Sequence, residues 1–237
     1  KDKLPAWNLR NIVTMDPALT VPRVQFNWSN LSVAGKTSLG LLNTGTLTDF
    51  IRGDRSNEGP SGYRERESIL GDFINTNPVF AKDASDSANA NIPTVGSSYG
   101  AYVNGVKKTR FGVLYVGGND GMLHAFKETR GASPSEDGKE IFAYVPRAVY
   151  PNLANLASRT YGTTDNYHTY FVDGPLRDVD VYLTSGTTGW RNYLFGSLGA
   201  GGRGVYALDI TDPTALGTNT IRWEVNSLSE SELGHVL

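Results

Sequence analysis

The sequence contains no cysteine among its 237 residues. This absence excludes disulfide bonds, thiolate nucleophiles and cysteine-ligated metals, although it does not fix the cellular compartment. No apolar run reaches the roughly 20 residues that a membrane-spanning helix needs. The chain does not open on a signal peptide, and its first residues, KDKLPAWNLR, lead us to expect a segment cut from the interior of a longer protein.

The sequence also lacks a strong charge of either sign. Its net charge is −2 and its pI is about 5.9. We therefore expect neither a nucleic-acid-binding surface nor a polybasic membrane anchor. Only 19% of the residues are charged, whereas glycine (27), tyrosine (12) and phenylalanine (9) are frequent. This composition favours a turn-rich β protein over a helical one.

From residue 76 onward the pattern of apolar residues predicts two sets of four strands. The first set covers residues 78–80, 111–116, 122–128 and 140–146, and the second covers 170–183, 190–198, 204–210 and 220–225. The two sets align at Ala125 and Ala207, 82 positions apart. Repeated four-stranded units predict propeller blades, here larger than the usual ~40–45 residues. The predicted fold is mainly all-β, a β-propeller with quinoprotein-like blades. Two blades leave the ring incomplete, so we expect further blades C-terminal to Leu237.

The predicted organisation has two parts. Residues 1–75 form a mixed helical and loop lead-in, and residues 76–237 form the blades. Ser29 is the expected cap of a lead-in helix that runs to Leu42, and Gly53 is expected to end a second short helix. A further short helix is predicted to begin at Pro151 in the connector between the blades. Residues 83–98 are polar and predict a mobile loop.

Three glycine-containing segments resemble ligand-binding loops. Residues 117–121 in LYVGGNDGMLHAF separate two apolar runs and predict a tight turn between strands. GAGGRG (199–204) matches a dinucleotide fingerprint by letter, but a strand-like run follows it where a helix is required, so a turn is again predicted. AGKTS (34–38) contains the end of a phosphate loop without its first glycine. We reject it as a phosphate site.

The titratable residues predict no catalytic residue and no metal ligand. The three histidines have no ligand spacing, and nothing in the sequence fixes a serine or an aspartate near one of them; they are His124, His168 and His235. Three close aspartates do not match the spacing of a calcium loop. They are expected at strand edges and turn caps; they are Asp173, Asp178 and Asp180.

The tripeptide Arg52-Gly53-Asp54 is one that integrins recognise. It presents a cation and a carboxylate about a turn, and the polar residues that follow it suggest exposure. These three residues are the candidate receptor-binding site. The alternative is a local structural role, in which Asp54 caps a turn.

The stretch IRGDRSNEGPSGYRERESILGDFINTNPVF (51–80) resembles the PilC/PilY family of type IV pilus tip-associated proteins at the start of their C-terminal propeller. The family pattern is a short helix, R-G-D-R, an Arg-x-Arg pair, L-G-D and Asn-x-x-P-V. It is matched at residues 52–55, 64 and 66, 70–72, and 75–79. LYVGGNDGMLHAF, EIFAYVPRAVYPNL and LFGSLGAGGRGVYALDITDP are similar to blade segments of the same family. The resemblance covers residues 45–237, with a weaker match over 8–45.

This resemblance implies a non-enzymatic protein of a Gram-negative bacterium, secreted or displayed at the pilus tip or outer membrane. It would support pilus assembly, oppose retraction and mediate adhesion in virulence. The implied partners are minor pilins and the assembly machinery, with host receptors such as integrins as further candidates. Calcium is implied in a later blade outside these residues, and no cofactor is expected in this chain.

Two alternatives remain open. The pattern of Tyr115, Gly117, Asp120, Gly121, Leu123 and Ala125 also resembles the blades of PQQ-dependent dehydrogenases. Residues 127–131 depart from that repeat, and a shared fold does not confer activity. The other alternative is a generic recognition propeller. In either binding role, loops 83–98, 129–139 and 160–167 are the expected contact regions.

Overall fold

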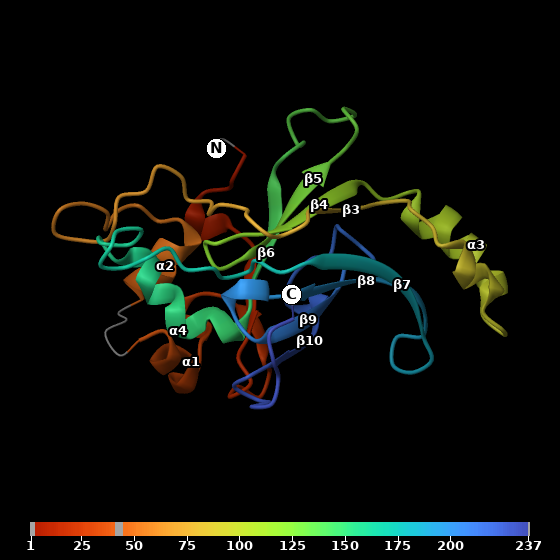
Figure 1. Ribbon diagram of the computed structural model, residues 1–237. Helices are drawn as coiled ribbons and strands as arrows, with labels where there is room; N and C mark the ends of the chain where they lie inside the picture. Colours follow the sequence, from red (N-terminus) through yellow and green to blue (C-terminus); the bar gives the residue numbers. More distant parts are fainter. Residues whose placement is uncertain (1–2, 41–44, 237) are drawn as a thin grey trace.

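The computed structural model describes residues 3–40 and 45–236. Two sheets lie against each other (Figure 1). The first contains four consecutive antiparallel strands, namely β3 (Val79–Ala81), β4 (Gly112–Gly117), β5 (Leu123–Glu128) and β6 (Glu140–Val145). The second contains β7 (Leu176–Leu183), β8 (Gly189–Ser197), β9 (Gly204–Asp209) and β10 (Ile221–Asn226). The two predicted sets of four strands are confirmed, except that the strand predicted over 170–183 begins only at Leu176, after Gly174 and Pro175. The sheets of the described residues do not close into a ring.

The two sheets repeat one another in detail. In the first sheet, β6 carries an extra residue, Ile141, opposite the step from Ala125 to Phe126 in β5. In the second, β10 carries Arg222 opposite the step from Ala207 to Leu208 in β9. Such a bulge bends a strand and increases its twist. Because both bulges lie at the alanines that the sequence repeat aligned, the sheets are two copies of one blade.

The lead-in contributes strands that the sequence pattern did not reveal. Strand β1 (Ile12–Met15) pairs in parallel with β6, and β2 (Arg23–Gln25) pairs with the outer side of β1. The first sheet therefore has the order β2-β1-β6-β5-β4-β3. Ile12 and Val13 of β1 are fully buried within it. The domain boundary at residue 75 stays a prediction, but part of the lead-in is built into the first blade.

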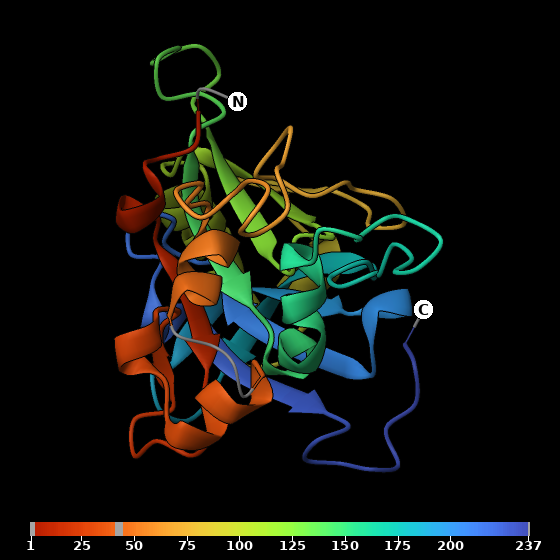
Figure 2. The same cartoon turned by 90° about the vertical axis from the view of Figure 1, so that its left-hand side faces the viewer.

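Short helices cover one side of the sheets (Figure 2). They are α1 (Val33–Ser38), α2 (Thr46–Arg52) and α4 (Tyr150–Leu153). Ser32, not Ser29, caps α1, because its hydroxyl accepts the Gly35 N–H at 2.9 Å. The predicted end at Leu42 lies outside the described residues. Helix α2 ends at Gly53, whose φ of +115° suits glycine, as predicted. AGKTS (34–38) lies entirely within α1 and forms no phosphate loop.

Single turns of tighter or wider helix complete the backbone. The 3-10 turns are Trp7–Leu9, Trp28–Asn30, Ser87–Asn91, Gly96–Ser98, Arg147–Val149, Ala154–Ala157, Gly199–Gly201 and Thr218–Thr220, and a π turn spans Val103–Lys107. The connector helix predicted to begin at Pro151 is α4 with its flanking turns. GAGGRG forms a turn between β8 and β9 and precedes a strand, as predicted.

An arm, defined as residues 82–110, projects from the first sheet between β3 and β4 (Figure 1). It contains α3 (Tyr99–Tyr102) and the π turn. Lys107 forms a 2.7 Å ion pair with Asp180 of β7, and both side chains are 3% exposed. The hydroxyl of Tyr99 donates to the same carboxylate. The arm is therefore fastened to the second blade. The predicted loop 83–98 contains two of the 3-10 turns, and its mobility stays a prediction.

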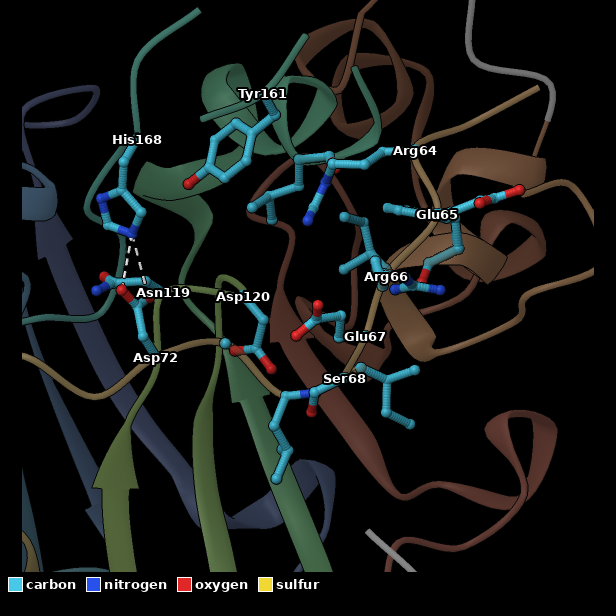
Figure 3. Close-up of a pocket in the computed structure, with 16 residues that line it drawn as sticks. Arg64, Glu65, Arg66, Glu67, Ser68, Asp72, Asn119, Asp120, Tyr161 and His168 are labelled. Carbon is cyan, nitrogen blue, oxygen red and sulfur yellow. Dashed lines mark hydrogen bonds and ion pairs between the residues drawn. The ribbon is translucent and has the colours of Figure 1, made fainter. Parts of the chain in front are cut away.

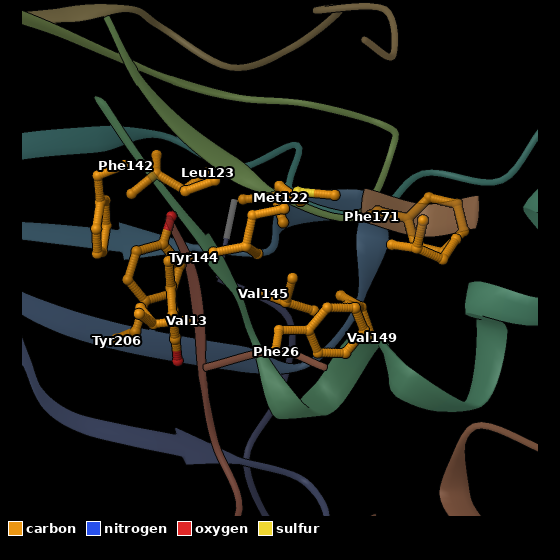
Figure 4. Close-up of a cluster of buried hydrophobic side chains, with 14 of the residues drawn as sticks. Val13, Phe26, Met122, Leu123, Phe142, Tyr144, Val145, Val149, Phe171 and Tyr206 are labelled. Carbon is orange, nitrogen blue, oxygen red and sulfur yellow. The ribbon is translucent and has the colours of Figure 1, made fainter. Parts of the chain in front are cut away.

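One hydrophobic core fills the space between the sheets and beneath the lead-in (Figure 4). Tyr144 of β6 and Tyr206 of β9 meet edge to face, with ring centroids 5.2 Å apart. Phe26 packs on Tyr150 in the same way at 5.7 Å. Because these contacts join both blades and the lead-in, the three parts share one core.

The antiparallel order assigns the turns to two ends of the sheets. The β4–β5 turn, the β8–β9 turn and the connector between β6 and β7 lie at one end, here called the connector end. The arm and the β5–β6 loop lie at the other. At the connector end, Gly118 N–H donates to Met122 O at 2.8 Å and Gly121 has φ of +93°. The predicted turn within LYVGGNDGMLHAF is thereby confirmed.

Candidate functional site

A cleft of about 460 Å³ opens at the connector end (Figure 3). Four segments line it: helix α2, the irregular segment of residues 64–72, the β4–β5 turn and the connector. Loop 160–167, one of the predicted contact loops, borders its mouth through Tyr161. The cleft lies where the lead-in meets the first blade, and the Arg-x-Arg pair and the L-G-D segment of the family pattern line it.

Arg52, the first residue of the predicted receptor-binding tripeptide, is buried. It is 5% exposed. Its guanidinium donates to the carbonyl oxygens of Phe26, Trp7 and Arg10 at 2.9–3.1 Å. In return, Arg10 donates to the carbonyl of Arg52 at 2.6 Å. The planar fork of arginine suits this use, since it satisfies several buried carbonyls at once.

Gly53 and Asp54 also have structural roles. Gly53 is buried at the helix end, and a Cβ there would lie 3.1 Å from Ile69 Cδ1. The Asp54 carboxylate accepts the N–H of Ser56 at 3.0 Å and its hydroxyl at 2.6 Å, which is the expected turn cap. The tripeptide is thus not displayed as one continuous exposed surface. This burial weighs against receptor binding, which itself stays to be tested.

The Arg-x-Arg pair is divided between the interior and the cleft wall. Arg66 forms a 2.7 Å ion pair with Glu58, and both side chains are at most 7% exposed. Arg66 also donates to the carbonyls of Phe50 and Asp54. Arg64 instead donates to Leu156 O at 3.1 Å. The pair therefore fastens residues 64–66 to α2 on one side and to the connector on the other.

The L-G-D and Asn-x-x-P-V segments hold the β4–β5 turn in place. The N–H of Asn119 donates to Asp72 O at 3.0 Å. A Cβ at Gly71 would lie 2.3 Å from Asp120 N, so only glycine fits without displacement. Asn75 donates from both its backbone and its side chain to Asp173 at 3.1 and 2.6 Å. The signature residues thus join lead-in, turn and second blade.

A chain of alternating charges runs beneath the cleft. Arg10 donates to Glu140 through Nε at 2.6 Å and Nη2 at 2.7 Å. Glu140 also contacts His124 Nδ1 at 2.7 Å, and His124 Nε2 lies 3.0 Å from Asp120. His124 and the Arg10 side chain are fully buried, whereas Asp120 is 8% exposed and reaches the cleft floor.

The chain of alternating charges sets the protonation states of His124 and Glu140. Burial would lower the pKa of His124, but the carboxylates of Asp120 and Glu140 outweigh it and raise the pKa to about 9. Burial would raise the pKa of Glu140, but hydrogen bonds from His124 and Arg10 lower it to about 2. At neutral pH His124 is therefore an imidazolium that donates from both nitrogens. It has no free lone pair with which to act as a base.

The chain of alternating charges was not predicted from the sequence. Nothing in the sequence fixed a carboxylate near a histidine, whereas in the structure His124 lies between two. The pairing register of β5 with β6 could have revealed the contact between His124 and Glu140. His124 pairs with Ala143, and Glu140 pairs with Phe126 on the other side of the bulge. That signal requires the bulge to be known first.

The remaining histidines lie at the surface of the connector end. His168 Nε2 lies 3.0 Å from a carboxylate oxygen of Asp72 at the mouth of the cleft. His235 Nδ1 contacts Gly199 O at 3.0 Å. Within residues 3–40 and 45–236, no three histidine or acidic side chains form a group that could hold a metal ion. The calcium site implied for a later blade stays a prediction. The described residues also include no helix long and apolar enough to cross a membrane.

Comparison with known proteins identifies relatives along the whole chain. The PilY1 beta-propeller domain profile matches residues 70–232. A type IV pilus biogenesis factor PilY1 homolog of Xylella fastidiosa is 38% identical over 98% of this chain and 17% of its own length. PilY1 of Pseudomonas aeruginosa strain PAK is 38% identical over 78% of this chain and 15% of its own length. The chain therefore spans about a sixth of these relatives.

A solved structure is also similar. The crystal structure of the Pseudomonas aeruginosa PilY1 C-terminal domain is 32% identical, covers 66% of this chain and 26% of that chain, and superposes with a TM-score of 0.45. The profile match extends over more than half of the sequence and includes both blades. The chain belongs to the PilY1 β-propeller domain family.

Proposed function

We propose that this chain is a propeller portion of a type IV pilus biogenesis factor and that it works by binding. The full protein would support pilus assembly at the cell surface or pilus tip. Its relatives are named type IV pilus biogenesis factors, and that role is transferred here as a proposal because the chain spans about a sixth of their length.

The observation that carries the proposal is the position of the family pattern. These four segments, residues 52–55, 64–66, 70–72 and 75–79, fasten the lead-in to both blades through the buried Arg52 and Arg66 and through hydrogen bonds of Asp72 and Asn75. A rigid junction of this kind holds the connector-end loops at fixed positions, as a recognition surface requires. Minor pilins and the assembly machinery are the proposed partners, and host receptors such as integrins are further candidates.

The cleft supports a binding role over a catalytic one. His124, which is buried beneath the cleft, holds its proton between two carboxylates. A general base needs a pKa near the working pH and an open lone pair. The described residues that line the cleft include no nucleophile hydrogen-bonded to a base. Opposition to retraction, adhesion and the calcium of a later blade belong to the proposed role of the whole protein.

The test is complementation of a deletion strain of the source bacterium. The full-length gene should restore surface pili, counted by electron microscopy, and twitching motility. A gene carrying Gly71→Val should restore neither, because the side chain displaces the β4–β5 turn, whereas Glu136→Gln on the opposite end should restore both. Normal pili in the deletion strain would instead favour a recognition propeller without a pilus role. Dye-linked oxidation of alcohols by the full-length protein with PQQ and calcium would favour the dehydrogenase alternative.

A further inference from the structure

A buried amine and a buried amide share one carboxylate where the arm meets the second blade. Lys107 Nζ donates to both oxygens of Asp180, at 2.9 Å to Oδ1 and at 2.7 Å to Oδ2. Asn192 Nδ2 donates to the same Oδ1 at 3.0 Å. Lys107 is 2% exposed and Asn192 is fully buried. The shared oxygen therefore holds the amine next to the amide, with little access to water.

Strand pairing and the arm together set this arrangement. Asp180 of β7 and Asn192 of β8 are direct partners in the antiparallel register. Side chains of directly opposite residues lie on the same face of a sheet. Lys107 is the last residue of the π turn in the arm and supplies the third group. The fold thus brings together three side chains that come from three separate elements.

The carbonyl oxygen of the same amide accepts a hydrogen bond from a cation. Arg110 Nη2 donates to Asn192 Oδ1 at 2.8 Å. Arg110 is itself held in place, because it also donates to the backbone carbonyls of Lys82 and Ile210 at 2.7–3.0 Å. A fixed guanidinium at this oxygen stabilises the negative charge that the oxygen acquires when a nucleophile attacks the amide carbon. The amide is therefore polarised at its oxygen while Asp180 contacts its nitrogen.

Aromatic side chains surround the carboxylate. Tyr99, Tyr102 and Trp190 belong to a small buried cluster that is separate from the main core. The rings of Tyr99 and Trp190 have centroids 4.7 Å apart, and the Tyr99 hydroxyl donates to Asp180 Oδ2 at 2.6 Å. In such surroundings charged groups are poorly solvated, which favours proton transfer from an ammonium to a carboxylate because both become neutral. The neutral amine then has the lone pair that a nucleophile needs.

We propose that Lys107 and Asn192 become joined by an isopeptide bond. Asp180 takes a proton from the Lys107 ammonium, and the freed lone pair of Nζ attacks Cγ of Asn192. Arg110 stabilises Oδ1 while that oxygen carries negative charge. The Asp180 carboxyl then gives its proton to Nδ2 and takes the surplus proton from Nζ. The Cγ–Nδ2 bond breaks, and the nitrogen leaves as ammonia.

The reaction is balanced without any co-reactant. One ammonium and one primary amide give one secondary amide and one ammonium ion, and no group is oxidised or reduced. Because Asp180 holds both reacting groups in place, the step gains from proximity as an intramolecular reaction does. The bond closes a covalent link between the arm and the second blade in a chain that has no cysteine. Such a link restricts the unfolded chain in the way that a disulfide does. This inference does not depend on the pilus role.

The experiment is mass spectrometry of the full-length protein purified from the bacterium that makes it. A tryptic digest should contain residues 83–108 joined to the peptide that begins at Asn192, and the joined species should be lighter than the two separate peptides by one ammonia. Finding both peptides separate and unchanged in mass would overturn the proposal. A separate peptide in which Asn192 has become aspartate would also overturn it, because water and not Lys107 would then have attacked the amide.

Two variants and one internal control test the assigned roles. Lys107→Arg keeps a cation beside Asp180 but removes the amine, so the protein should fold and the joined peptide should disappear. Asp180→Asn removes the proton acceptor and should also abolish the joined peptide. Lys108 Nζ donates to Asn104 Oδ1 at 2.8 Å, but both residues are exposed, and in residues 3–40 and 45–236 no carboxylate pairs with this lysine. Trypsin should therefore still cleave after Lys108. A joined peptide in Lys107→Arg, or an unchanged yield in Asp180→Asn, would refute the mechanism.

Discussion

Glu140 lies in the buried chain of alternating charges, so the stability of the fold should depend strongly on its charge. Glu140→Gln keeps the size of the side chain and removes its charge. The Glu140 carboxylate accepts hydrogen bonds from two nitrogens of Arg10 at 2.6 and 2.7 Å and contacts His124 at 2.7 Å. Removing one partner of a buried pair leaves an uncompensated charge, which costs about 3–5 kcal/mol. In a domain of this size that loss lowers Tm by about 6–20 °C.

The same variant should change the pH dependence of stability. The pKa of His124 is about 9 in the folded chain against an ordinary value of 6.5. A raised pKa stabilises the fold fully below pH 6.5, and this stability, about 3 kcal/mol, is lost as pH rises through 9. In Glu140→Gln one of the two carboxylates that raise this pKa is gone. The alkaline loss should then be smaller and should be complete at a lower pH.

The assay is urea unfolding followed by circular dichroism at pH 6, 7.5 and 9.5. Glu136→Gln is the matched control, because Glu136 pairs with Lys127 and Lys139 at the surface. An exposed pair contributes about 0–1 kcal/mol, so the control should stay close to the parent chain. A loss below 1 kcal/mol in Glu140→Gln, with the parent pH profile, would show that the charge chain does not stabilise the blade.

Three further changes test other contacts. Gly71→Ala places a Cβ 2.3 Å from Asp120 N and should cost about 1–3 kcal/mol in urea unfolding; unchanged stability would mean that the turn moves freely. Lys107→Met leaves Asp180 buried without its cation, which should cost about 3–5 kcal/mol. Thermolysin should then cut the arm before the sheets unfold, and uniform protection would contradict this. Asp54→Glu should weaken the turn cap by about 0.5–1.5 kcal/mol. It should leave host-cell binding of the full-length protein unchanged, so lost binding with a retained fold would show that the tripeptide is used.

The blades could be predicted because their signals are local. Apolar runs of strand length flank Gly117–Gly121, and the strands form on both sides of that turn. The alignment of Ala125 with Ala207 likewise anticipated the repeat, and both residues are fully buried. Alternation and turn residues determine such elements without knowledge of distant partners.

The lead-in and the cleft could not be predicted in the same way, because their partners are distant in sequence. Strand β1 has four residues and pairs with β6, about 130 positions later. Arg52 precedes a polar stretch and looked exposed, yet it points inward at the end of α2. Only the tertiary arrangement reveals that its charge is used by three backbone carbonyls.

The parallel pairing of β1 with β6 has a mechanical consequence. Ile12, Val13 and Thr14 lie beside Ala143, Tyr144 and Val145 in the same direction. Tension applied to the chain before β1 and after β6 therefore pulls the two strands past each other along their length. Their hydrogen bonds share the load and break together, whereas an antiparallel hairpin pulled at its open end unzips one bond at a time. This junction is built to resist stretching along the chain.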